Sequence, residues 1–302
     1  MQYTKIRGVI VPLLTPFDPQ GRIDEAAAAR LVDYLIARGV KGLFPGGTTG
    51  EGPLLTGAER RRLAEVVVGA AGGRVPVIVH TGAATTREAV ALTRHAQRIG
   101  AQAAALITPY YYRYPEEALF RHFAHIAAQT PDFPLYLYNF PAVTGNALSV
   151  DLVARLVEHC PNIVGLKDSS GALDLLVASL SWRGGAFNPA NGSDGLLLAA
   201  LALGLEACVS GNANVVPELV VALYDAMARG DLATARALQA KLDRARAILS
   251  DGADLSLFKG LLARRGLPVG EVRSPLLPAS EAKLAACWEA LAALGVELGP
   301  VA

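Results

Sequence analysis

Short apolar segments alternate with longer amphipathic segments over about the first 230 residues of the chain. The apolar segments are nearly continuous in hydrophobicity, as expected for strands of a parallel sheet whose two faces are both covered. We expect eight strands, at residues 8–14, 42–44, 75–80, 103–107, 134–138, 162–167, 185–187 and 206–210.

Helix signals follow each expected strand. Thr56-Gly-Ala-Glu59 and Thr85-Thr-Arg-Glu88 have the spacing of a capping box, in which a side chain at each end satisfies an unpaired amide. Pro115-Glu-Glu117 puts proline and acids where a helix start favours them. The expected helices cover about 24–39, 85–100, 150–159 and 172–181, and others start near 56, 115, 196 and 217.

Eight strand–helix units in about 230 residues match the size of a (β/α)₈ (TIM) barrel. An open doubly wound sheet is the alternative, but it usually carries a glycine-rich fingerprint after its first strand, where this chain has Thr15-Pro-Phe17. From about Asp231 the pattern becomes helical only, at 232–249, 255–265 and 280–294. We therefore predict an α/β barrel domain at 1–230 and a C-terminal helical extension at 231–302 packed on it.

Composition narrows the possible partners. The net charge of +1 gives no electrostatic reason to expect nucleic acid or an acidic membrane surface, and 52% hydrophobic residues suffice for a large core. The longest apolar run, at 196–205, is too short to cross a bilayer. Cys160, Cys208 and Cys287 are widely spaced and odd in number, which favours reduced thiols in the cytoplasm. The histidines show no HExxH pattern. His122 and His125 share a helical face but have no carboxylate or cysteine grouping, so we expect no metal.

The active site of such a barrel forms at the carboxyl ends of its strands. These positions bring together several hydroxyls and one amine, without a nicotinamide fingerprint, and the set suits the capture of a small 2-oxo acid. They are Thr15, Gly46–Glu51, His80–Thr81, Pro109–Tyr112, Tyr138–Pro141, Lys167–Ser169, Asn191–Asp194 and Ser210–Gly211.

Lys167 ends the sixth expected strand, and a desolvated lysine there can act as a nucleophile. The alternative is a strand-end lysine whose ammonium reaches solvent. Only six lysines occur in a chain that otherwise uses arginine, which would serve a solvated end equally but cannot attack a carbonyl. The retention of a lysine at this position favours a chemical role for Lys167.

Two further features have both a chemical and a structural interpretation. Gly46-Gly-Thr-Thr-Gly50 can hold a carboxylate or phosphate on open backbone amides, or it can be an ordinary turn between strand and helix. Tyr138 can relay protons beside an amine that forms an imine, or it can be a core tyrosine. For the cluster Tyr110–Tyr112, rim packing or a subunit contact is the default interpretation.

Four motifs then appear in order and at consistent spacing: Gly47-Thr-Thr-Gly-Glu51, Pro109-Tyr-Tyr111, Tyr138-Asn-Phe-Pro141 and Gly165-Leu-Lys-Asp168. Over essentially its whole length the chain resembles the N-acetylneuraminate lyase / dihydrodipicolinate synthase family of pyruvate-dependent class I aldolases. Each motif is weak alone, but the four in register are highly specific.

The resemblance implies an imine of Lys167 with a 2-oxo acid such as pyruvate, so that no separate cofactor is needed. Thr48 and Thr49, with nearby amides such as that of Gly47, would hold the carboxylate. Tyr138 would move protons, linked through Thr48 to Tyr111 of a neighbouring subunit, which implies a dimer that often pairs into a tetramer. The carbonyl of Val209 would lie near the imine.

Val143 departs from the biosynthetic synthases, which carry arginine there to hold a semialdehyde carboxylate. Losing a charge-assisted contact of roughly 1.5–3 kcal/mol weakens binding by about one to two powers of ten. Tyr138–Gly145 resembles instead the aldolases of 2-keto-3-deoxy-gluconate or -pentonate, which yield pyruvate and an aldehyde. Substrate hydroxyls or a phosphate would then contact Arg113, Ser169, Asn191, Ser193 and Asp194, each of which can equally be structural.

The primary hypothesis is thus a sugar-acid aldolase that breaks or forms a C3–C4 bond. The first alternative is 4-hydroxy-tetrahydrodipicolinate synthase, which condenses pyruvate with aspartate semialdehyde. A catalytically idle barrel that binds 2-oxo acids is the second, and the presence of the lysine, the tyrosines and both threonines argues against it.

Overall fold

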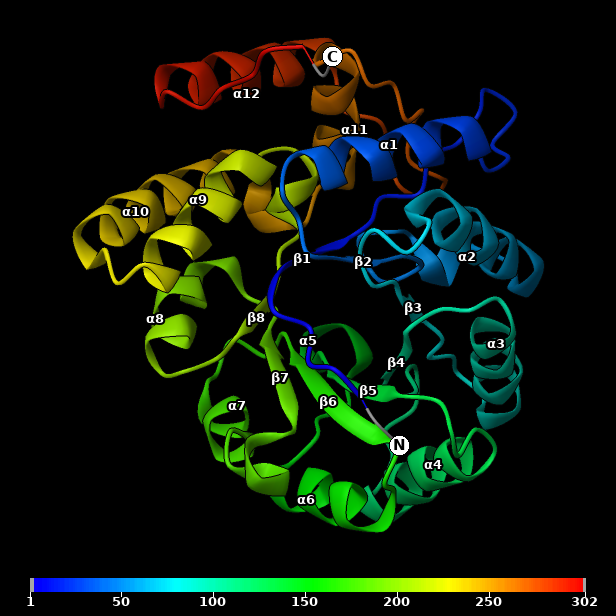
Figure 1. Ribbon diagram of the computed structural model, residues 1–302. Helices are drawn as coiled ribbons and strands as arrows, with labels where there is room; N and C mark the ends of the chain where they lie inside the picture. Colours follow the sequence, from blue (N-terminus) through cyan, green and yellow to red (C-terminus); the bar gives the residue numbers. More distant parts are fainter. Residues whose placement is uncertain (1–2, 301–302) are drawn as a thin grey trace.

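The computed structural model describes residues 3–300 and shows eight parallel strands arranged as a barrel (Figure 1). Their hydrogen-bonded order is β2-β1-β8-β7-β6-β5-β4-β3. An isolated parallel bridge joins Leu43 of β2 to Val77, the residue just before β3, so the barrel is nearly closed. The predicted (β/α)₈ fold is confirmed. The strands are β1 Gly8–Pro12, β2 Gly42–Phe44, β3 Ile78–His80, β4 Ala103–Ile107, β5 Leu135–Asn139, β6 Ile163–Asp168, β7 Asn188–Asn191 and β8 Ala207–Val209.

Helices surround the barrel and cover the outer face of the sheet (Figure 1). They are α1 Glu25–Ala37, α2 Gly57–Ala71, α3 Thr86–Arg98, α4 Glu116–Ala128, α6 Val150–His159, α7 Asp174–Ser179, α8 Leu197–Ala202 and α9 Pro217–Ala228. A short helix that the sequence pattern did not predict, α5 Pro141–Thr144, follows β5 directly. Proline at its first turn favours this start because its ring fixes φ near the helical value.

Two apolar layers form the core. Side chains that point into the barrel, among them Ile10, Phe44 and Ile78, form the inner layer, and the helix–sheet interface forms the outer one. Gly165 makes room for the inner layer, since a Cβ there would lie 2.3 Å from the ring of Tyr136. Tyr136 donates to Asn188 at 2.5 Å across the barrel.

The seventh strand was misplaced by the sequence pattern. Residues 185–187 were expected, but β7 begins at Asn188, because Arg183, Gly184 and Gly185 all have positive φ and form a turn. The strand sequence Asn-Pro-Ala-Asn is polar and yet fully buried. Its asparagines satisfy neighbouring backbone groups, for example the amide of Ile6 at 2.9 Å, so hydrophobicity alone could not reveal this strand.

The helix caps were predicted with mixed success. Thr56 and Glu59 form the complete capping box. Thr85 accepts from the amide of Glu88, but within residues 3–300 the return bond from the Glu88 side chain to the Thr85 amide is not formed. The third strand is shorter than expected, because β3 begins at Ile78 instead of residue 75.

The C-terminal helices α10 Leu232–Ile248, α11 Leu255–Arg264 and α12 Glu281–Ala293 pack to one side of the barrel, and α10 lies against α9 (Figure 1). A division into two units near residue 230 stays a prediction. None of the helices in the described part of the chain is both long and apolar enough to cross a membrane.

Glu59 joins α2 to the segment after α11 and should make stability depend on pH. Arg273 lies 2.7 Å from its carboxylate and lowers the pKa of Glu59 to about 2. A depressed folded pKa means stabilisation that is present above the unfolded value near 4.5 and lost as pH falls toward 2. We expect wild type to exceed Glu59→Gln in thermal midpoint at pH 7, with a smaller difference at pH 3. A constant gap from pH 7 to pH 3 would contradict this account.

Candidate active site

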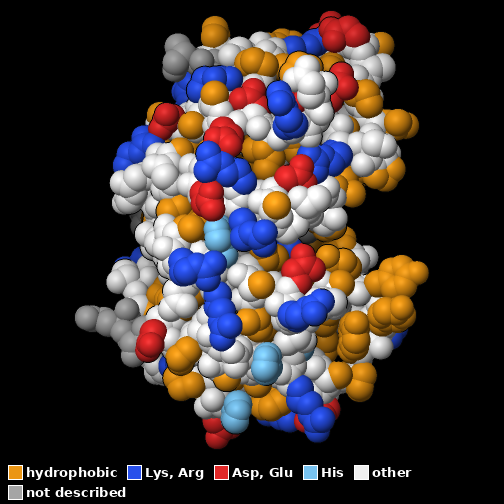
Figure 2. All heavy atoms as spheres, turned by 90° about the vertical axis from the view of Figure 1, so that its right-hand side faces the viewer, with side chains coloured by type: hydrophobic (Ala, Val, Ile, Leu, Met, Phe, Trp, Pro, Cys, Tyr) orange, Lys and Arg blue, Asp and Glu red, His pale blue; other side chains and the backbone are white. Residues whose placement is uncertain are grey.

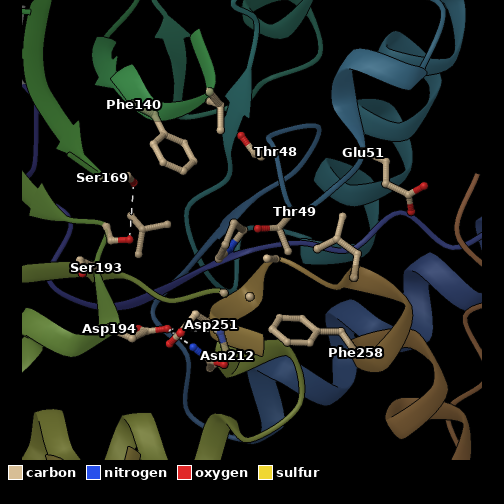
Figure 3. A pocket seen from close by; sticks show the side chains of 18 of the residues that line it. Thr48, Thr49, Glu51, Phe140, Ser169, Ser193, Asp194, Asn212, Asp251 and Phe258 are labelled. Carbon is tan, nitrogen blue, oxygen red and sulfur yellow. Dashed lines mark hydrogen bonds between the residues drawn. The ribbon is translucent and has the colours of Figure 1, made fainter. Parts of the chain in front are cut away.

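A cavity of about 660 Å³ opens at the carboxyl ends of the strands, where the barrel meets the C-terminal helices (Figure 3). Strands contribute Pro12, Tyr138, Lys167 and Val209 to its wall, and the loop after β2 contributes Thr48 and Thr49. The remaining wall comes from residues 51–54 after the same loop, from loops after β5 to β8 and from residues 246–276. The fold thus brings residues that are far apart in the sequence together at one mouth of the barrel.

Lys167 lies inside this cavity and is 6% exposed. In the sheet register it lies between Tyr138 of β5 and Ala190 of β7. Its Nζ is 4.0 Å from the centroid of the Tyr138 ring and 4.8 Å from that of Phe44. Across residues 3–300, no carboxylate forms an ion pair with it. The amine is therefore enclosed by aromatic faces and left available to a ligand.

Gly192, after β7, provides the space that Lys167 occupies. A Cβ at this position would lie 3.1 Å from Cε of Lys167 and 2.2 Å from Oγ of Ser169. Any side chain would thus compete with the lysine for the cavity, so the glycine is required for close approach rather than for a special φ.

Tyr138 is buried between aromatic rings. Its ring stacks on Phe140 at 6.1 Å and meets Phe44 and His80 edge-on at 6.0 Å each. Burial, followed by the charges of Arg60 and Lys167, holds the pKa of His80 well below its usual value. His80 is therefore neutral, and its ring meets that of Tyr138, which lies next to Lys167.

The loop Gly47–Gly52 forms a tight turn in which several amides bond within the turn. Those of Gly50 and Gly52 donate to the carbonyl of Gly47, at 3.1 and 3.0 Å, and that of Glu51 donates to Thr48 at 3.1 Å. Within the described residues, the amides of Thr48 and Thr49 have no acceptor. Two free amides beside two hydroxyls make this loop a suitable carboxylate nest.

Asp168 and Asn139 fix the ends of β5 and β6. Asn139 Nδ2 donates to Asp168 Oδ2 at 3.1 Å, and Asp168 Oδ1 accepts from the amide of Ser170 at 2.6 Å. The carboxylate next to Lys167 in the sequence therefore serves the strand ends rather than the amine. This arrangement keeps Tyr138 and Lys167 side by side.

The far end of the cavity is polar. Asp194 is buried and accepts from Asn212 Nδ2 at 2.5 Å, and burial raises its pKa despite this bond. Arg246 lies 3.3 Å from both Asp243 and Asp251, so acids already neutralise its charge. Ser193 also lines this region, whereas Ser169 lines the cavity closer to Lys167 (Figure 3). Such a mixture of paired charges and hydroxyls suits a ligand rich in hydroxyl groups.

The structure places the predicted site residues in two groups. Nine of them line the main cavity: Lys167, Tyr138, Thr48, Thr49, Val143, Ser169, Ser193, Asp194 and Val209. Tyr110 lines a smaller neighbouring cavity of about 200 Å³, which shares Thr48 and Val143 with the main one.

The other predicted residues do not line the main cavity. The side chain of Arg113 donates to the carbonyl of Gly145, and that of Asn191 donates to Ser193 at 2.7 Å. Gly47 packs on Phe44, where a Cβ would lie 2.8 Å away. Tyr111 points outward and is 87% exposed. Their proposed substrate contacts stay predictions.

Sequence reasoning missed the contribution of the C-terminal segment to the cavity. Arg246, Asp251, Phe258 and Leu276 all line it. No local motif marks them, since each is an ordinary residue of a helix or loop until the fold brings it to the barrel mouth. A charged pair near the end of a helix carries no such signal by itself.

The chain matches the dihydrodipicolinate synthetase family model over residues 5–294. It is 41% identical to 4-hydroxy-tetrahydrodipicolinate synthase of Phenylobacterium zucineum, covering 95% of this chain and 96% of that protein. It is 39% identical to an uncharacterized DapA-like lyase of Halobacterium salinarum, covering 96% and 95%.

Solved structures agree with these relatives. Dihydrodipicolinate synthase DapA-2 of Bacillus anthracis matches with a TM-score of 0.91 at 34% identity, covering 96% of this chain and 99% of that one. YagE, a prophage protein of Escherichia coli K12 solved in complex with pyruvate, also matches at 0.91, with 32% identity and 97% and 100% coverage. The chain therefore belongs to the dihydrodipicolinate synthetase family and is a lyase of the pyruvate-dependent class I aldolase type.

Proposed function

We propose that Lys167 forms an imine with pyruvate and that the enzyme makes or breaks the bond between C3 and C4 of a 2-keto-3-deoxy sugar acid. The observation that carries the proposal is the enclosed amine of Lys167, unpaired by any acid of residues 3–300, in a cavity that also holds Tyr138, Thr48 and Thr49. The pyruvate complex of YagE supports the choice of ligand.

In the direction of cleavage, the neutral amine of Lys167 adds to C2 of the substrate. Water then leaves with uptake of one proton, and a protonated imine forms. A base then takes the proton of the C4 hydroxyl, the C3–C4 bond breaks, and its electron pair moves toward the imine to give an enamine and a free aldehyde. Protonation at C3 and hydrolysis release pyruvate and restore the lysine. No metal or separate cofactor is required.

The surrounding residues have distinct roles in this proposal. Tyr138, whose ring lies beside Lys167, exchanges the C4 hydroxyl proton. The hydroxyls and free amides of Thr48 and Thr49, next to Gly47, hold the carboxylate. The carbonyl of Val209 in the cavity wall lies near the imine.

Tyr111 has the features of a residue that acts across subunits. Its side chain is 87% exposed and its φ is +83°, an uncommon value for a bulky residue. Figure 2 shows apolar side chains gathered along one edge of the molecule beside a hollow in its surface. We propose a dimer, able to pair into a tetramer, in which Tyr111 completes the proton relay of the neighbouring site through Thr48.

The preference for a sugar acid rests on the charges around the cavity. A semialdehyde carries a second carboxylate, which needs a free cation. Lys167 and Arg246 line the cavity, but Lys167 is consumed as the imine and Arg246 is paired with two acids. Asp194, Ser169 and Ser193 instead offer partners to hydroxyl groups. Arg113 and Asn191 would reach such a substrate only after rearranging their present hydrogen bonds.

The second candidate is 4-hydroxy-tetrahydrodipicolinate synthase, because several relatives at 38–41% identity bear that name. Pyruvate release from a panel of 2-keto-3-deoxy acids, run beside pyruvate plus aspartate semialdehyde, separates the two. Efficient use of the semialdehyde with no cleavage of any sugar acid would establish the second candidate and overturn the first.

Val143 should control this choice. It is 51% exposed at the border between the two cavities. We expect Val143→Arg to raise kcat/KM for the semialdehyde by about tenfold, because an added charge-assisted hydrogen bond contributes roughly 1.5 kcal/mol or more. Val143→Met is the control for side-chain length without charge. Equal gains in both variants would show that charge is not the determinant.

A further inference from the structure

A buried ion pair joins the C-terminal helices to the loop 47–52, which carries Thr48 and Thr49. Lys259 of α11 lies 2.7 Å from Glu51, and their side chains are 1% and 0% exposed. Glu51 lines the cavity through the loop 47–52, whereas Lys259 does not line it. Two charges removed from water in this way are costly unless each is fully partnered.

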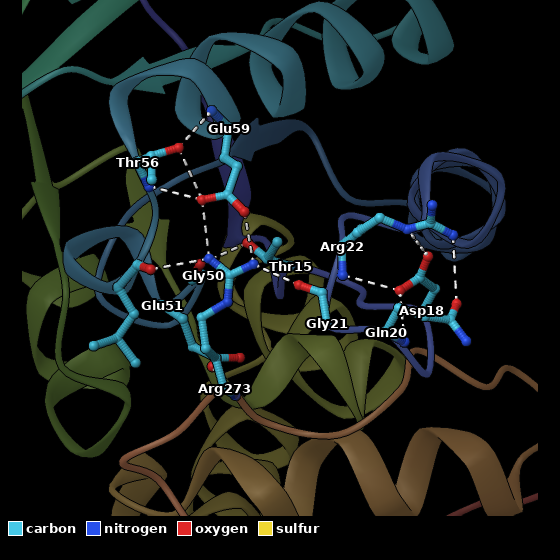
Figure 4. Close-up of polar contacts among 11 residues, drawn as sticks. Thr15, Asp18, Gln20, Gly21, Arg22, Gly50, Glu51, Thr56, Glu59 and Arg273 are labelled. Atoms are coloured by element: carbon cyan, nitrogen blue, oxygen red, sulfur yellow. Dashed lines mark hydrogen bonds and ion pairs between the residues drawn. The ribbon is translucent and has the colours of Figure 1, made fainter.

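The pair is held from several directions. Arg273 donates its backbone amide to Glu51 Oε2 at 2.7 Å (Figure 4). Lys259 donates to the carbonyl of Glu271 at 2.8 Å and lies 4.2 Å from the centroid of the Phe17 ring. The guanidinium of Arg273 donates to the carbonyl of Leu54 at 3.0 Å, beyond the same loop. The Glu51 carboxylate therefore has a fixed position relative to the barrel.

The backbone at Glu51 couples this carboxylate to the ligand-binding amides. Its φ of +55° and ψ of +27° are left-handed, which is uncommon for a residue with a side chain. Its amide donates to the carbonyl of Thr48 at 3.1 Å and so closes the turn that presents the amides of Thr48 and Thr49. Gly50 packs beneath, where a Cβ would lie 2.7 Å from the carbonyl of Leu13.

We infer that Lys259 and Glu51 are positioning residues that hold the amides of Thr48 and Thr49 in place for the substrate carboxylate. The inference rests on the proposed function, since it concerns binding of the 2-oxo acid. It makes the C-terminal helices part of the active-site machinery rather than a separate attachment. Loss of Lys259 leaves Glu51 buried without its cation, and the turn relaxes toward a conformation that hydrates the carboxylate.

The test uses the full-length protein and measures how much pyruvate gives half-maximal borohydride trapping on Lys167, read by intact mass. We expect Lys259→Met to raise this concentration by about tenfold, the effect of one lost charge-assisted hydrogen bond. At saturating pyruvate the extent of trapping should match wild type, because Lys167 is untouched. With ethyl pyruvate, which has no carboxylate charge, the shift should stay below about twofold.

Arg265→Met is the matched control. Arg265 is a buried cation at the end of the same helix, paired with Glu218 at 2.9 Å, and it makes no contact with residues 47–52 among its hydrogen bonds within the described chain. Both variants should lower the thermal midpoint, but only Lys259→Met should weaken the binding of pyruvate. If Lys259→Met does not fold, Glu51→Gln, which keeps the side-chain shape, should show the same selective shift.

The outcomes separate this inference from the proposed function. If the wild-type protein gains no adduct from pyruvate and borohydride, the proposed function itself is wrong. Wild type that is trapped normally, with Lys259→Met or Glu51→Gln showing an unchanged half-saturation, would overturn the positioning role. An equal shift for pyruvate and ethyl pyruvate, or for Lys259→Met and Arg265→Met, would also overturn it, because a general loss of stability does not depend on the ligand carboxylate.

Discussion

Lys167→Ala is expected to abolish turnover, lowering kcat by roughly 10⁴-fold or more, since the proposed imine has no other amine to form on. Among residues 3–300 the lysines besides Lys167 do not line the cavity, so none can substitute for it. The fold should survive, with a change in unfolding free energy within about 1 kcal/mol. The side chain makes no ion pair within that range, and its removal leaves a space that opens to the cavity.

Pyruvate release, borohydride trapping by intact mass and a thermal melt together measure this prediction. Lys167→Arg is the informative control, because it keeps a cation beside Tyr138 but cannot attack a carbonyl. Both variants should be inactive and untrapped. Substantial activity in Lys167→Arg would mean that the position needs only positive charge, and the imine mechanism would be falsified.

Tyr138→Phe and Tyr111→Phe should each lower kcat, by about 10²-fold to 10³-fold for the former, because each removes a phenol from the proposed proton relay. The ring of Tyr138 would remain stacked on Phe140 and beside Lys167, so imine formation with pyruvate should still be trapped. Loss of turnover with retained trapping distinguishes a proton-transfer role from a packing role.

Mixing the two variants tests whether Tyr111 acts in the neighbouring subunit. A mixed dimer would contain one site with both phenols, so co-expression in equal amounts should restore about a quarter of wild-type activity, as half of the dimers are mixed and each has one complete site. Unmixed samples of each variant at the same total concentration are the control. Activity equal to the mean of the two variants would place both phenols in one subunit's site, or Tyr111 outside the relay.

Much of the barrel could be predicted from the sequence because its strands are short apolar runs with clear helix signals between them. The exceptions have local physical causes. β7 is polar because Asn188 and Asn191 satisfy buried hydrogen bonds, and hydrophobicity is blind to such a strand. The capping box at Thr85 is incomplete because the spacing of a motif does not fix where the Glu88 side chain goes.

The residues of the candidate site also divide into those that the sequence could predict and those that it could not. Residues at strand ends, such as Lys167, Tyr138 and Val209, were predictable because the carboxyl ends of parallel strands share one mouth. Arg113 and Asn191 were placed in the site by their position in the chain, but their side chains bond to nearby carbonyls instead. Sequence position gives the neighbourhood of a side chain and leaves its direction to local hydrogen bonding.

The sequence by itself determined the barrel, the strand that carries Lys167 and the family of the reaction, since each follows from local patterns or short motifs. Only the tertiary structure decided how Lys167 is enclosed and which groups face it. Arg246 and Asp251 line the cavity, and Lys259 pairs with Glu51 of its wall, although all three lie more than 70 residues after Lys167 in the chain. Their effect depends on burial and on the distances between charges, which are properties of the packed molecule rather than of any segment of it.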